Sequence, residues 1–432
     1  MEDGNWILEC DDTLAGDVVL PSSYNGTPIT KIYANAFEDC DLITSIVVPE
    51  GILEIQDEAF KNCTGLISVT LPESLDSVTL GNYIFDDCTS LSNVILPQSM
   101  KIIPNGLFSS CSSLTDVNLP ENLELIETGA FRFTGLTSFT VPQGVTLDDF
   151  IFSGCSDLAV FNFSDQTYIP AGTFYLCRNL TSVLIPDTVT SIGSSAFGKC
   201  ASLQSIDLPD SITKISRGSF YECTSLQSIN LPDSITNIEN AAFYGCTSLQ
   251  SINLPSKLES LGLGWFYGNL EGVFEGCNAI TKITIPKNLI ELGKYAFRNC
   301  SALEYAYFEG DNHFASSEFP FLGSNPKIYF NENTNGWDNS PFSLVWEMIE
   351  KPVARVTFNS QINEMELSYE EVSQNYVLYS SDSLMGPYTP VEDQSIQVTT
   401  GANGQITKVF NDTVTTSKFY KLVLNLDDYH SN

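Results

Sequence analysis

Short segments along the chain alternate between apolar and polar residues, and a proline follows many of them. Residues 203–208 read Leu-Gln-Ser-Ile-Asp-Leu, and Pro209 comes next. Alternation with a period of two is typical of a half-buried strand, and proline ends strands because it has no N–H to donate. Apolar residues then return at Ile212, Ile215 and Phe220. The pattern predicts a short strand followed by an extended or tight-turn segment that directs its apolar residues inward.

This pattern repeats along the chain every 23 residues or so, since the segment that begins at Ser205 has a close copy at Ser228. A Phe-x-x-Cys element marks each copy, and in the copy at Phe131 the cysteine is replaced by Thr134. The complete elements lie at Phe37/Cys40, Phe60/Cys63, Phe85/Cys88, Phe108/Cys111, Phe152/Cys155, Phe174/Cys177, Phe197/Cys200, Phe220/Cys223, Phe243/Cys246, Phe274/Cys277 and Phe297/Cys300. So many copies of one pattern indicate a repeat protein.

A single copy is too short to bury its own apolar residues, but stacked copies bury them against one another. The sequence therefore predicts a mainly β solenoid of about 12–13 coils with one parallel sheet, roughly 55–65 Å long at ~4.8 Å per coil. Equivalent side chains would form columns through the core. We expect this structural core ladder to include Phe60, Cys63, Phe108, Cys111, Phe197, Cys200, Phe220, Cys223, Phe243, Cys246, Phe297 and Cys300.

The repeat resembles the BspA-like leucine-rich repeats, whose pattern is close to L-x-x-I-x-L-P-x-x-[IVL]-x-x-I-x-x-x-A-F-x-x-C. The match covers roughly residues 18–309, almost coil by coil. The resemblance implies a curved, right-handed leucine-rich-repeat solenoid. It also implies a secreted or surface-displayed bacterial protein, because members are typically of that kind, and those characterised act in adhesion and protein binding.

One coil carries an insertion, because Phe243 and Phe274 are 31 residues apart, eight more than one period. Trp265, Phe266 and Tyr267 lie in this stretch between glycines, and exposed aromatic residues often anchor a protein partner. We take these three as candidate partner-binding residues. The alternative is that they fold back over the edge of the solenoid. Either Phe266 or Phe274 holds the core position, and the other is displaced.

Eleven of the twelve cysteines occupy a single column of the repeat. Neighbours in such a column are about one coil, ~5 Å, apart, whereas bridged Cβ atoms lie roughly 3.5–4.5 Å apart. A linear column without a nearby His is also a poor zinc site, because zinc ligands converge tetrahedrally. We therefore expect reduced thiols that pack as small apolar side chains. Cys10 lies outside the column, and it could pair only with a cysteine of a neighbouring coil, such as Cys40.

The sequence predicts three parts: the solenoid with its N-terminal cap at residues 1–303, an aromatic-rich capping segment at 304–350, and a separate module at 351–432. In the module, short alternating segments are separated by turn residues such as Gly386-Pro387. Such spacing is typical of a small antiparallel β-sandwich. The module also resembles, more weakly, C-terminal β modules of secreted bacterial proteins.

The chain is strongly acidic, with 53 Asp and Glu against 19 Lys and Arg and a formal net charge of −34. This charge disfavours nucleic acid and anionic lipid as partners, and no apolar run of about 18 residues predicts a membrane span. Neither His313 nor His430 is placed for a catalytic triad, and no nucleotide-binding or metal-binding motif occurs. We expect no catalytic residue, cofactor or metal centre, although carboxylates could bind calcium incidentally.

These patterns together predict an extracellular or cell-surface scaffold that is non-catalytic and monomeric and binds a protein, such as a host extracellular matrix or surface protein. The alternative is a structural spacer that displays a C-terminal β domain, which binds glycan or anchors the protein to the cell surface. Residues 1–6 lack the basic and apolar signature of a secretory leader. We expect a secreted or cell-surface protein whose leader has been removed; the other interpretation of this N-terminus is an intracellular protein.

Overall fold

The computed structural model describes residues 6–7, 9–10, 13–75, 80–262, 272–311 and 320–330, and the backbone of the strands between residues 348 and 424. The chain divides into two compact units, Met1–Ile349 and Glu350–Asn432. Its described residues form strands and turns, with no helix among them. Accordingly, no apolar helix of membrane-crossing length occurs in this part of the chain.

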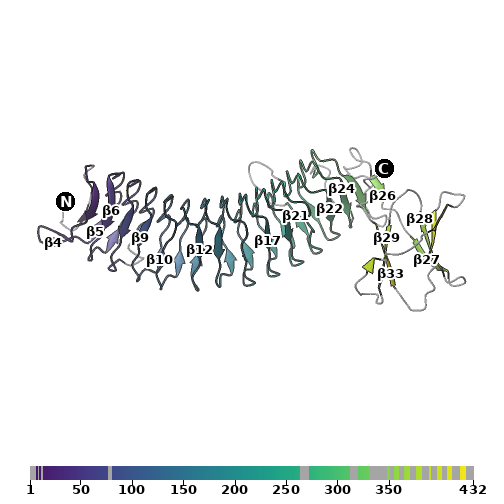
Figure 1. Cartoon of the computed structure of the whole chain (residues 1–432), viewed down its shortest axis with the longest axis horizontal. Coiled ribbons are helices and arrows are strands. Elements are labelled where there is room, and N and C mark those ends of the chain that lie inside the picture. The colour runs from purple at the N-terminus through teal and green to yellow at the C-terminus, as the bar shows by residue number, and fades with distance from the viewer. Residues whose placement is uncertain are drawn as a thin grey trace. The chain divides into compact units, whose positions relative to one another are not determined.

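The first unit is a stack of coils, and one strand of most coils belongs to a parallel ladder (Figure 1). Most of these strands pair in parallel with the equivalent strand of a neighbouring coil, as Ser205 pairs with Ser228 and Ile206 with Ile229. The described strands of this ladder are divided into four separate sheets. The Ile side chains are buried, while their strand neighbours face solvent. The strands of this ladder are β2 (Gly16–Val19), β6 (Ile43–Val47), β8 (Ser68–Thr70), β9 (Asn93–Ile95), β12 (Ser138–Thr140), β14 (Val160–Asn162), β17 (Ser205–Asp207), β19 (Ser228–Asn230), β22 (Lys282–Ile285), β24 (Tyr305–Phe308) and β25 (Lys327–Phe330). A further strand, β26 (Met348–Glu350), adjoins β25 in the same sheet.

The return segments form a second parallel ladder, where the sequence predicts only one sheet. For example, Lys214–Ile215 pairs with Asn237–Ile238. Extended backbone in stacked coils presents N–H and C=O groups to its equivalent, so both extended segments of a coil pair with their neighbours. The strands are β1 (Trp6–Ile7), β5 (Lys31–Ile32), β7 (Glu54–Ile55), β10 (Ile102–Ile103), β11 (Leu125–Ile126), β13 (Thr146–Leu147), β15 (Tyr168–Ile169), β16 (Ser191–Ile192), β18 (Lys214–Ile215), β20 (Asn237–Ile238), β21 (Ser260–Leu261) and β23 (Glu291–Leu292), and a separate hairpin joins β3 (Ser23–Tyr24) to β4 (Thr27–Pro28).

Each coil closes through a tight turn that carries the ladder Phe, which we call the Phe turn. In the turn at residues 58–63, Glu58 and Asn62 have the left-handed backbone, with φ of 58° and 57°. The N–H groups of Glu58, Phe60 and Asn62 donate to the carbonyls of residues 82, 84 and 86 in the next coil. The Phe turns therefore also hydrogen-bond from coil to coil, and together they form one side of the solenoid, which we call the turn edge.

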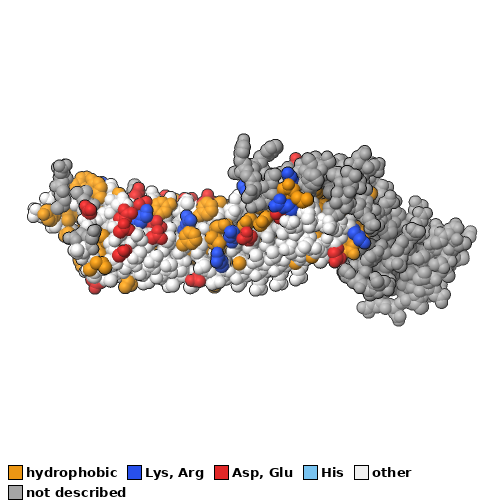
Figure 2. All heavy atoms as spheres, turned by 90° about the horizontal axis from the view of Figure 1, so that it is seen from above, with side chains coloured by type: hydrophobic (Ala, Val, Ile, Leu, Met, Phe, Trp, Pro, Cys, Tyr) orange, Lys and Arg blue, Asp and Glu red, His pale blue; other side chains and the backbone are white. Residues whose placement is uncertain are grey.

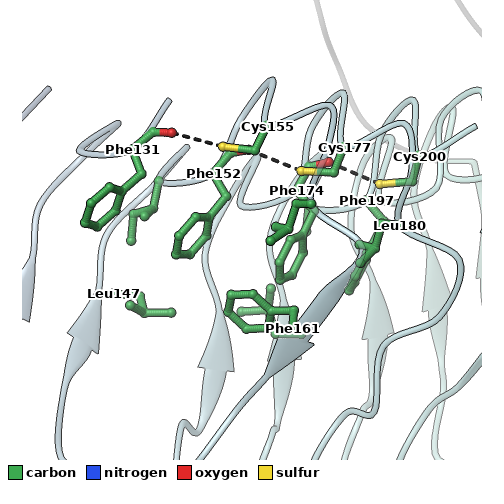
Figure 3. Close-up of a cluster of buried hydrophobic side chains, with 14 of the residues drawn as sticks. Phe131, Leu147, Phe152, Cys155, Phe161, Phe174, Cys177, Leu180, Phe197 and Cys200 are labelled. Atoms are coloured by element: carbon green, nitrogen blue, oxygen red, sulfur yellow. Dashed lines mark hydrogen bonds between the residues drawn. The ribbon is translucent and has the colours of Figure 1, made fainter. Parts of the chain in front are cut away.

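The core of the solenoid is a continuous stack of Phe rings, which Figure 3 shows in part. Thirteen rings from Phe37 to Phe321 stack in sequence, with centroids of neighbouring rings 4.8–6.3 Å apart. Phe60 and the ladder rings through Phe297 are fully buried. Phe321 belongs to the segment expected to cap the array, yet its ring lies 5.3 Å from that of Phe297 and extends the stack by one coil.

The second unit consists of antiparallel strands in two sheets, one with the order β27-β28-β32-β31 and one with the order β30-β29-β33. The seven short strands pair in antiparallel fashion, and the module bounds of 351–432 stay a prediction. A face-to-face sandwich of the two sheets stays a prediction. The strands are β27 (Arg355–Asn359), β28 (Glu364–Tyr369), β29 (Tyr376–Ser381), β30 (Thr389–Pro390), β31 (Gln397–Thr400), β32 (Ile406–Phe410) and β33 (Phe419–Leu424).

Candidate interaction surfaces

The cysteine column is a column of hydrogen-bond donors. The Cys63 thiol donates to the carbonyl oxygen of Phe37 in the preceding coil, with the sulfur 3.0 Å from that oxygen. All ten free cysteines make the same contact, at distances of 3.0–3.2 Å. Figure 3 shows three of these bonds side by side. Each thiol thus satisfies a buried Phe carbonyl of the coil before it.

Two described positions of this column hold a residue other than cysteine, and each of these side chains also donates a hydrogen bond. Ser324 stands three residues after Phe321, and its hydroxyl donates to the Phe297 carbonyl at 2.7 Å. Thr134 donates instead to the carbonyl of Phe131 in its own turn, at 2.9 Å. The expectation that these positions hold small apolar side chains is therefore incomplete. Apart from the disulfide-bonded Cys40, every described side chain of this column is small and donates a hydrogen bond to a Phe carbonyl.

Burial keeps the thiols of Cys155 and Cys246 protonated, as a donor must be. Desolvation raises the pKa of Cys155 to about 11 and that of Cys246 to about 12, from an ordinary value of 9.0. The thiolate is the nucleophilic form of cysteine, so a buried thiol of this kind is chemically inert. The column therefore contributes packing and hydrogen bonds rather than a reactive group.

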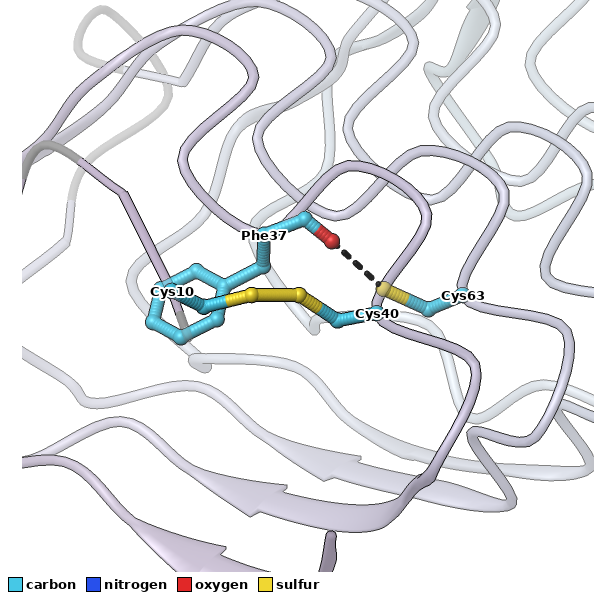
Figure 4. Close-up of a disulfide and its surroundings, with 4 residues drawn as sticks. All are labelled: Cys10, Phe37, Cys40 and Cys63. Atoms are coloured by element: carbon cyan, nitrogen blue, oxygen red, sulfur yellow. Dashed lines mark hydrogen bonds between the residues drawn. A yellow bond between two sulfur atoms is a disulfide. The ribbon is translucent and has the colours of Figure 1, made fainter. Parts of the chain in front are cut away.

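Cys40, the first cysteine of the column, forms a disulfide with Cys10 (Figure 4). This corrects the expectation that all eleven column cysteines are reduced, and it realises the one pairing considered for Cys10. The Cys10 N–H also donates to the carbonyl of Ala36, at 2.7 Å. No ladder Phe precedes Phe37, so the Cys40 sulfur has no equivalent carbonyl to bind and is available to the N-terminal segment.

Acidic side chains form hydrogen bonds between neighbouring coils at a second turn, which follows the proline at the end of the strand. Both carboxylate oxygens of Glu50 accept backbone N–H groups of the next coil, from Glu73 at 3.1 Å and from Ser74 at 3.2 Å. Glu73 accepts the N–H of Gln98 in the same way, at 3.0 Å. Part of the acidity of the chain is thus structural. Among the residues that the structure describes, no three His, Cys, Asp or Glu side chains gather to form a metal site.

The insertion precedes, in the chain, the Phe turn that begins at Gly272. Phe274 is the core residue of this coil, stacked between Phe243 and Phe297 at centroid distances of 5.2 and 5.3 Å. The choice between Phe266 and Phe274 for the core is therefore settled in favour of Phe274. Gly262 and Gly272 are the described residues on either side of the insertion. Trp265, Phe266 and Tyr267 lie outside the described residues.

Exposed aromatic side chains lie along the turn edge in the middle of the array. Phe133 and Phe150 are 38% and 42% exposed, and each ring covers a glycine of the next coil, Gly154 and Gly172 respectively. The Arg132 guanidinium lies 4.8 Å from the centre of the Phe133 ring. Figure 2 shows hydrophobic and charged side chains gathered in a row along the solenoid. Phe133, Phe150 and Arg132 have the aromatic and Arg composition that is common in protein interfaces.

A second exposed apolar surface lies on the solvent-facing side of the sheet β2-β6-β8-β9, near the N-terminus. Val19, Val47, Thr70 and Ile95 are direct partners on the adjacent strands β2, β6, β8 and β9. The exposed fractions of Val19, Val47 and Ile95 are 72%, 39% and 54%. We call these four residues the N-terminal stripe. Equivalent positions in later coils are mostly polar, such as Asn230, and that contrast is a signal the sequence offers for finding the stripe.

The family model for the BspA type leucine-rich repeat region, in six copies, matches residues 30–159, 167–271 and 270–366. This is well over half of the chain. The protein belongs to the BspA-type leucine-rich repeat family. Members of this family are typically bacterial surface or secreted proteins, and the repeat is typically non-catalytic.

Several solved structures resemble this BspA-type chain. A leucine-rich repeat protein from Bacteroides ovatus is 24% identical, with 76% of this chain and 96% of the other covered and a TM-score of 0.48. A leucine rich cell surface protein from Faecalibacterium prausnitzii is 24% identical, covers 76% and 89%, and has a TM-score of 0.45. The pneumococcal vaccine antigen PcpA is 19% identical, covers 81% and 93%, and has a TM-score of 0.49. No curated protein matches the chain.

Proposed function

We propose that this BspA-type protein is a secreted or cell-surface adhesion scaffold that binds a protein partner and catalyses no reaction. The observation that carries the proposal is the repeat itself, which stacks into a solenoid with long outward faces. Such solenoids bind through extended surfaces because each coil adds one row of side chains to the same face. Exposed aromatic and β-branched residues along the turn edge and the N-terminal stripe supply candidate contact points.

The Cys10–Cys40 disulfide supports a location outside the reducing cytoplasm. Disulfides persist in secreted and surface proteins, whereas cytosolic thiols are kept reduced. The ten remaining cysteines are compatible with the same location, because each is buried and engaged as a donor to a Phe carbonyl. A protonated, buried thiol does not exchange with disulfides, since exchange requires the thiolate.

The inserted segment with Trp265, Phe266 and Tyr267 is the first place to test for partner contact. It directly precedes the Phe turn of Phe274 in the chain, and insertions beside the turns of a solenoid often carry its binding residues. We expect Trp265→Ala to weaken partner binding at least tenfold while the unfolding midpoint stays within error of the wild type. Phe243→Ala is the contrasting variant, because it removes a fully buried ring and must lower stability. A large loss of stability in Trp265→Ala would show that the indole packs on the solenoid instead.

The proposed function is tested by the binding of the full chain to a panel of immobilised extracellular matrix proteins and, in parallel, to a glycan array. We expect saturable binding to at least one protein of the panel. Binding to glycans alone would favour the alternative, in which the solenoid is a spacer for the module at residues 351–432. Binding to neither would contradict the proposal.

A further inference from the structure

We propose that the N-terminal stripe is the docking site for a cationic protein segment that alternates apolar and basic side chains. This deepens the adhesion function above and rests on it. Four observations support the proposal: the strand register that aligns the stripe, the exposure of its side chains, the carboxylates along its two margins, and the scarcity of cations in the same coils.

The register makes the stripe continuous. Val19 pairs with Val47, Val47 with Thr70, and Thr70 with Ile95, so the four side chains stand in one row across a four-stranded sheet. At about 4.8 Å between strands, the row is roughly 15 Å long from end to end. β-branched side chains have few rotamers, so little conformational entropy is lost when a partner covers them.

Carboxylates border the stripe on both sides. Asp17 stands two residues before Val19, and hydrogen bonds from the Ser45 and Thr44 hydroxyls hold its carboxylate and lower its pKa. Glu50 and Glu73 follow the stripe residues Val47 and Thr70 by three positions, and backbone N–H groups of the next coil fix their carboxylates. These anionic groups are held in place before any partner arrives.

The surrounding coils offer almost no compensating charge. Residues 13–100 contain twelve acidic residues and two basic ones, Lys31 and Lys61. Lys31 pairs with Glu54 at 2.6 Å, and Lys61 pairs with Glu58 at 2.9 Å, so both are engaged with acids away from the stripe. A segment whose apolar side chains cover the stripe, and whose alternating Lys or Arg side chains reach the carboxylates at its margins, complements this surface in both charge and polarity.

The test uses the full chain and three labelled eight-residue peptides: alternating lysine–valine, alternating lysine–serine and alternating glutamate–valine. Binding is measured by fluorescence anisotropy at low and at physiological salt. We expect the lysine–valine peptide to bind at least tenfold more tightly than the other two. Its affinity should fall with salt, because the ion pairs at the margins are exposed and therefore screened.

Two variants separate the apolar contribution from the charged one. The double variant Val47→Ser/Ile95→Ser should weaken lysine–valine binding at least tenfold. Leu184→Ser is its control, because Leu184 is 83% exposed and pairs with Asn162 on the same face, several coils away. Glu50→Gln/Glu73→Gln should weaken binding and reduce its salt dependence. Gln98 already accepts a backbone N–H in the same column at 3.3 Å, so glutamine preserves the fold there.

Equal binding of the lysine–serine peptide would overturn the proposal, because it would show that cationic peptides bind through the acidic surface charge alone. Equal binding of the glutamate–valine peptide, or no effect of Val47→Ser/Ile95→Ser, would also overturn it. The adhesion function fails separately: it fails if the full chain binds no matrix protein, whatever the peptides do. Matrix binding that survives in the double variant would leave the adhesion function intact and place its site elsewhere.

Discussion

At the residue scale, one hydrogen bond explains why cysteine recurs in the core. Where the next coil carries a free column cysteine, the buried Phe carbonyl accepts the N–H of its own turn and a thiol of that next coil, as Phe174 does. Valine or alanine would fill the space but leave the second interaction unmade. Thr134 and Ser324 show that the donor is kept where the sulfur is lost. Side-chain size alone therefore does not define this position.

Substitution of one column cysteine should show how much its hydrogen bond contributes to stability. The Cys200 thiol is buried and donates to the Phe174 carbonyl at 3.1 Å. We expect Cys200→Ala to lower the free energy of unfolding by about 1–2 kcal/mol, and Cys200→Ser by less, because the hydroxyl can replace the donor. Urea unfolding of the two variants measures the difference. A serine variant that is less stable than the alanine variant would mean that the column is selected for apolar packing.

The raised thiol pKa values predict a loss of stability at high pH. Folded thiols stay protonated to a pKa of about 11 at Cys155 and about 12 at Cys246, whereas an unfolded thiol ionises near 9.0. Their contribution is complete below about pH 9 and is lost as the pH rises toward the folded values, because the unfolded chain then binds fewer protons. The loss approaches about 1.4 kcal/mol per pH unit for each thiol.

Denaturant midpoints between pH 8 and pH 10.5 measure this slope. Cys155→Thr is the matched control, because Thr134 already fills the equivalent position one coil earlier. The free energy of unfolding of this variant should fall less steeply with pH than that of the wild type, by the contribution of the one thiol that was removed. A midpoint that does not change above pH 9 would contradict the assignment.

At the element scale, the Phe turn is the unit that fixes both core and surface. Its two left-handed residues direct the ladder Phe inward. Side chains that point outward from the turn lie against the turn of the next coil. Glycine is needed where a ring of the preceding coil leans over the turn. A Cβ atom at Gly154 would collide with the ring of Phe133, and one at Gly172 would collide with Phe150.

A double-mutant cycle tests this coupling. Gly144 and Gly154 both have φ of +80°, but a Cβ at Gly144 would meet nothing within 4 Å. Gly144→Ala should therefore cost only the left-handed backbone penalty, about 1–2 kcal/mol. Gly154→Ala should cost about 1 kcal/mol more, and the excess should disappear when Phe133 is also replaced by alanine. An unchanged cost in that background would show that the ring does not pack on the glycine.

At the scale of the whole molecule, stability is the sum of contacts between neighbouring coils, so the ends need protection. The Cys10–Cys40 disulfide ties the N-terminal segment to the first coil of the stack. At the other end of the stack, the Phe column continues to Phe321 and the donor column to Ser324, whose hydroxyl also accepts the Cys300 N–H at 2.7 Å. In the described column, the first cysteine is therefore held by a disulfide, and the last position is held by hydrogen bonds of the Ser324 hydroxyl.

Thiol labelling checks this arrangement along the whole array. Native protein should take up almost no alkylating reagent, because all ten free thiols are buried. Unfolded protein should react at ten sites without reductant and, after reduction, at all twelve cysteines of the chain. Reaction at twelve sites in unreduced, unfolded protein would show that the disulfide is absent.

The sequence by itself determined the repeat, its period, the Phe and Cys columns and the family. These follow from side-chain periodicity, which any stacked arrangement of the copies must satisfy. It did not determine the second strand ladder, the donor role of the thiols or the continuation of the stack to Phe321. Those depend on which backbone groups face one another once the coils are stacked. The N-terminal stripe is of the same kind: Val19 and Ile95 are far apart in the chain, and only the strand register places them in one exposed row.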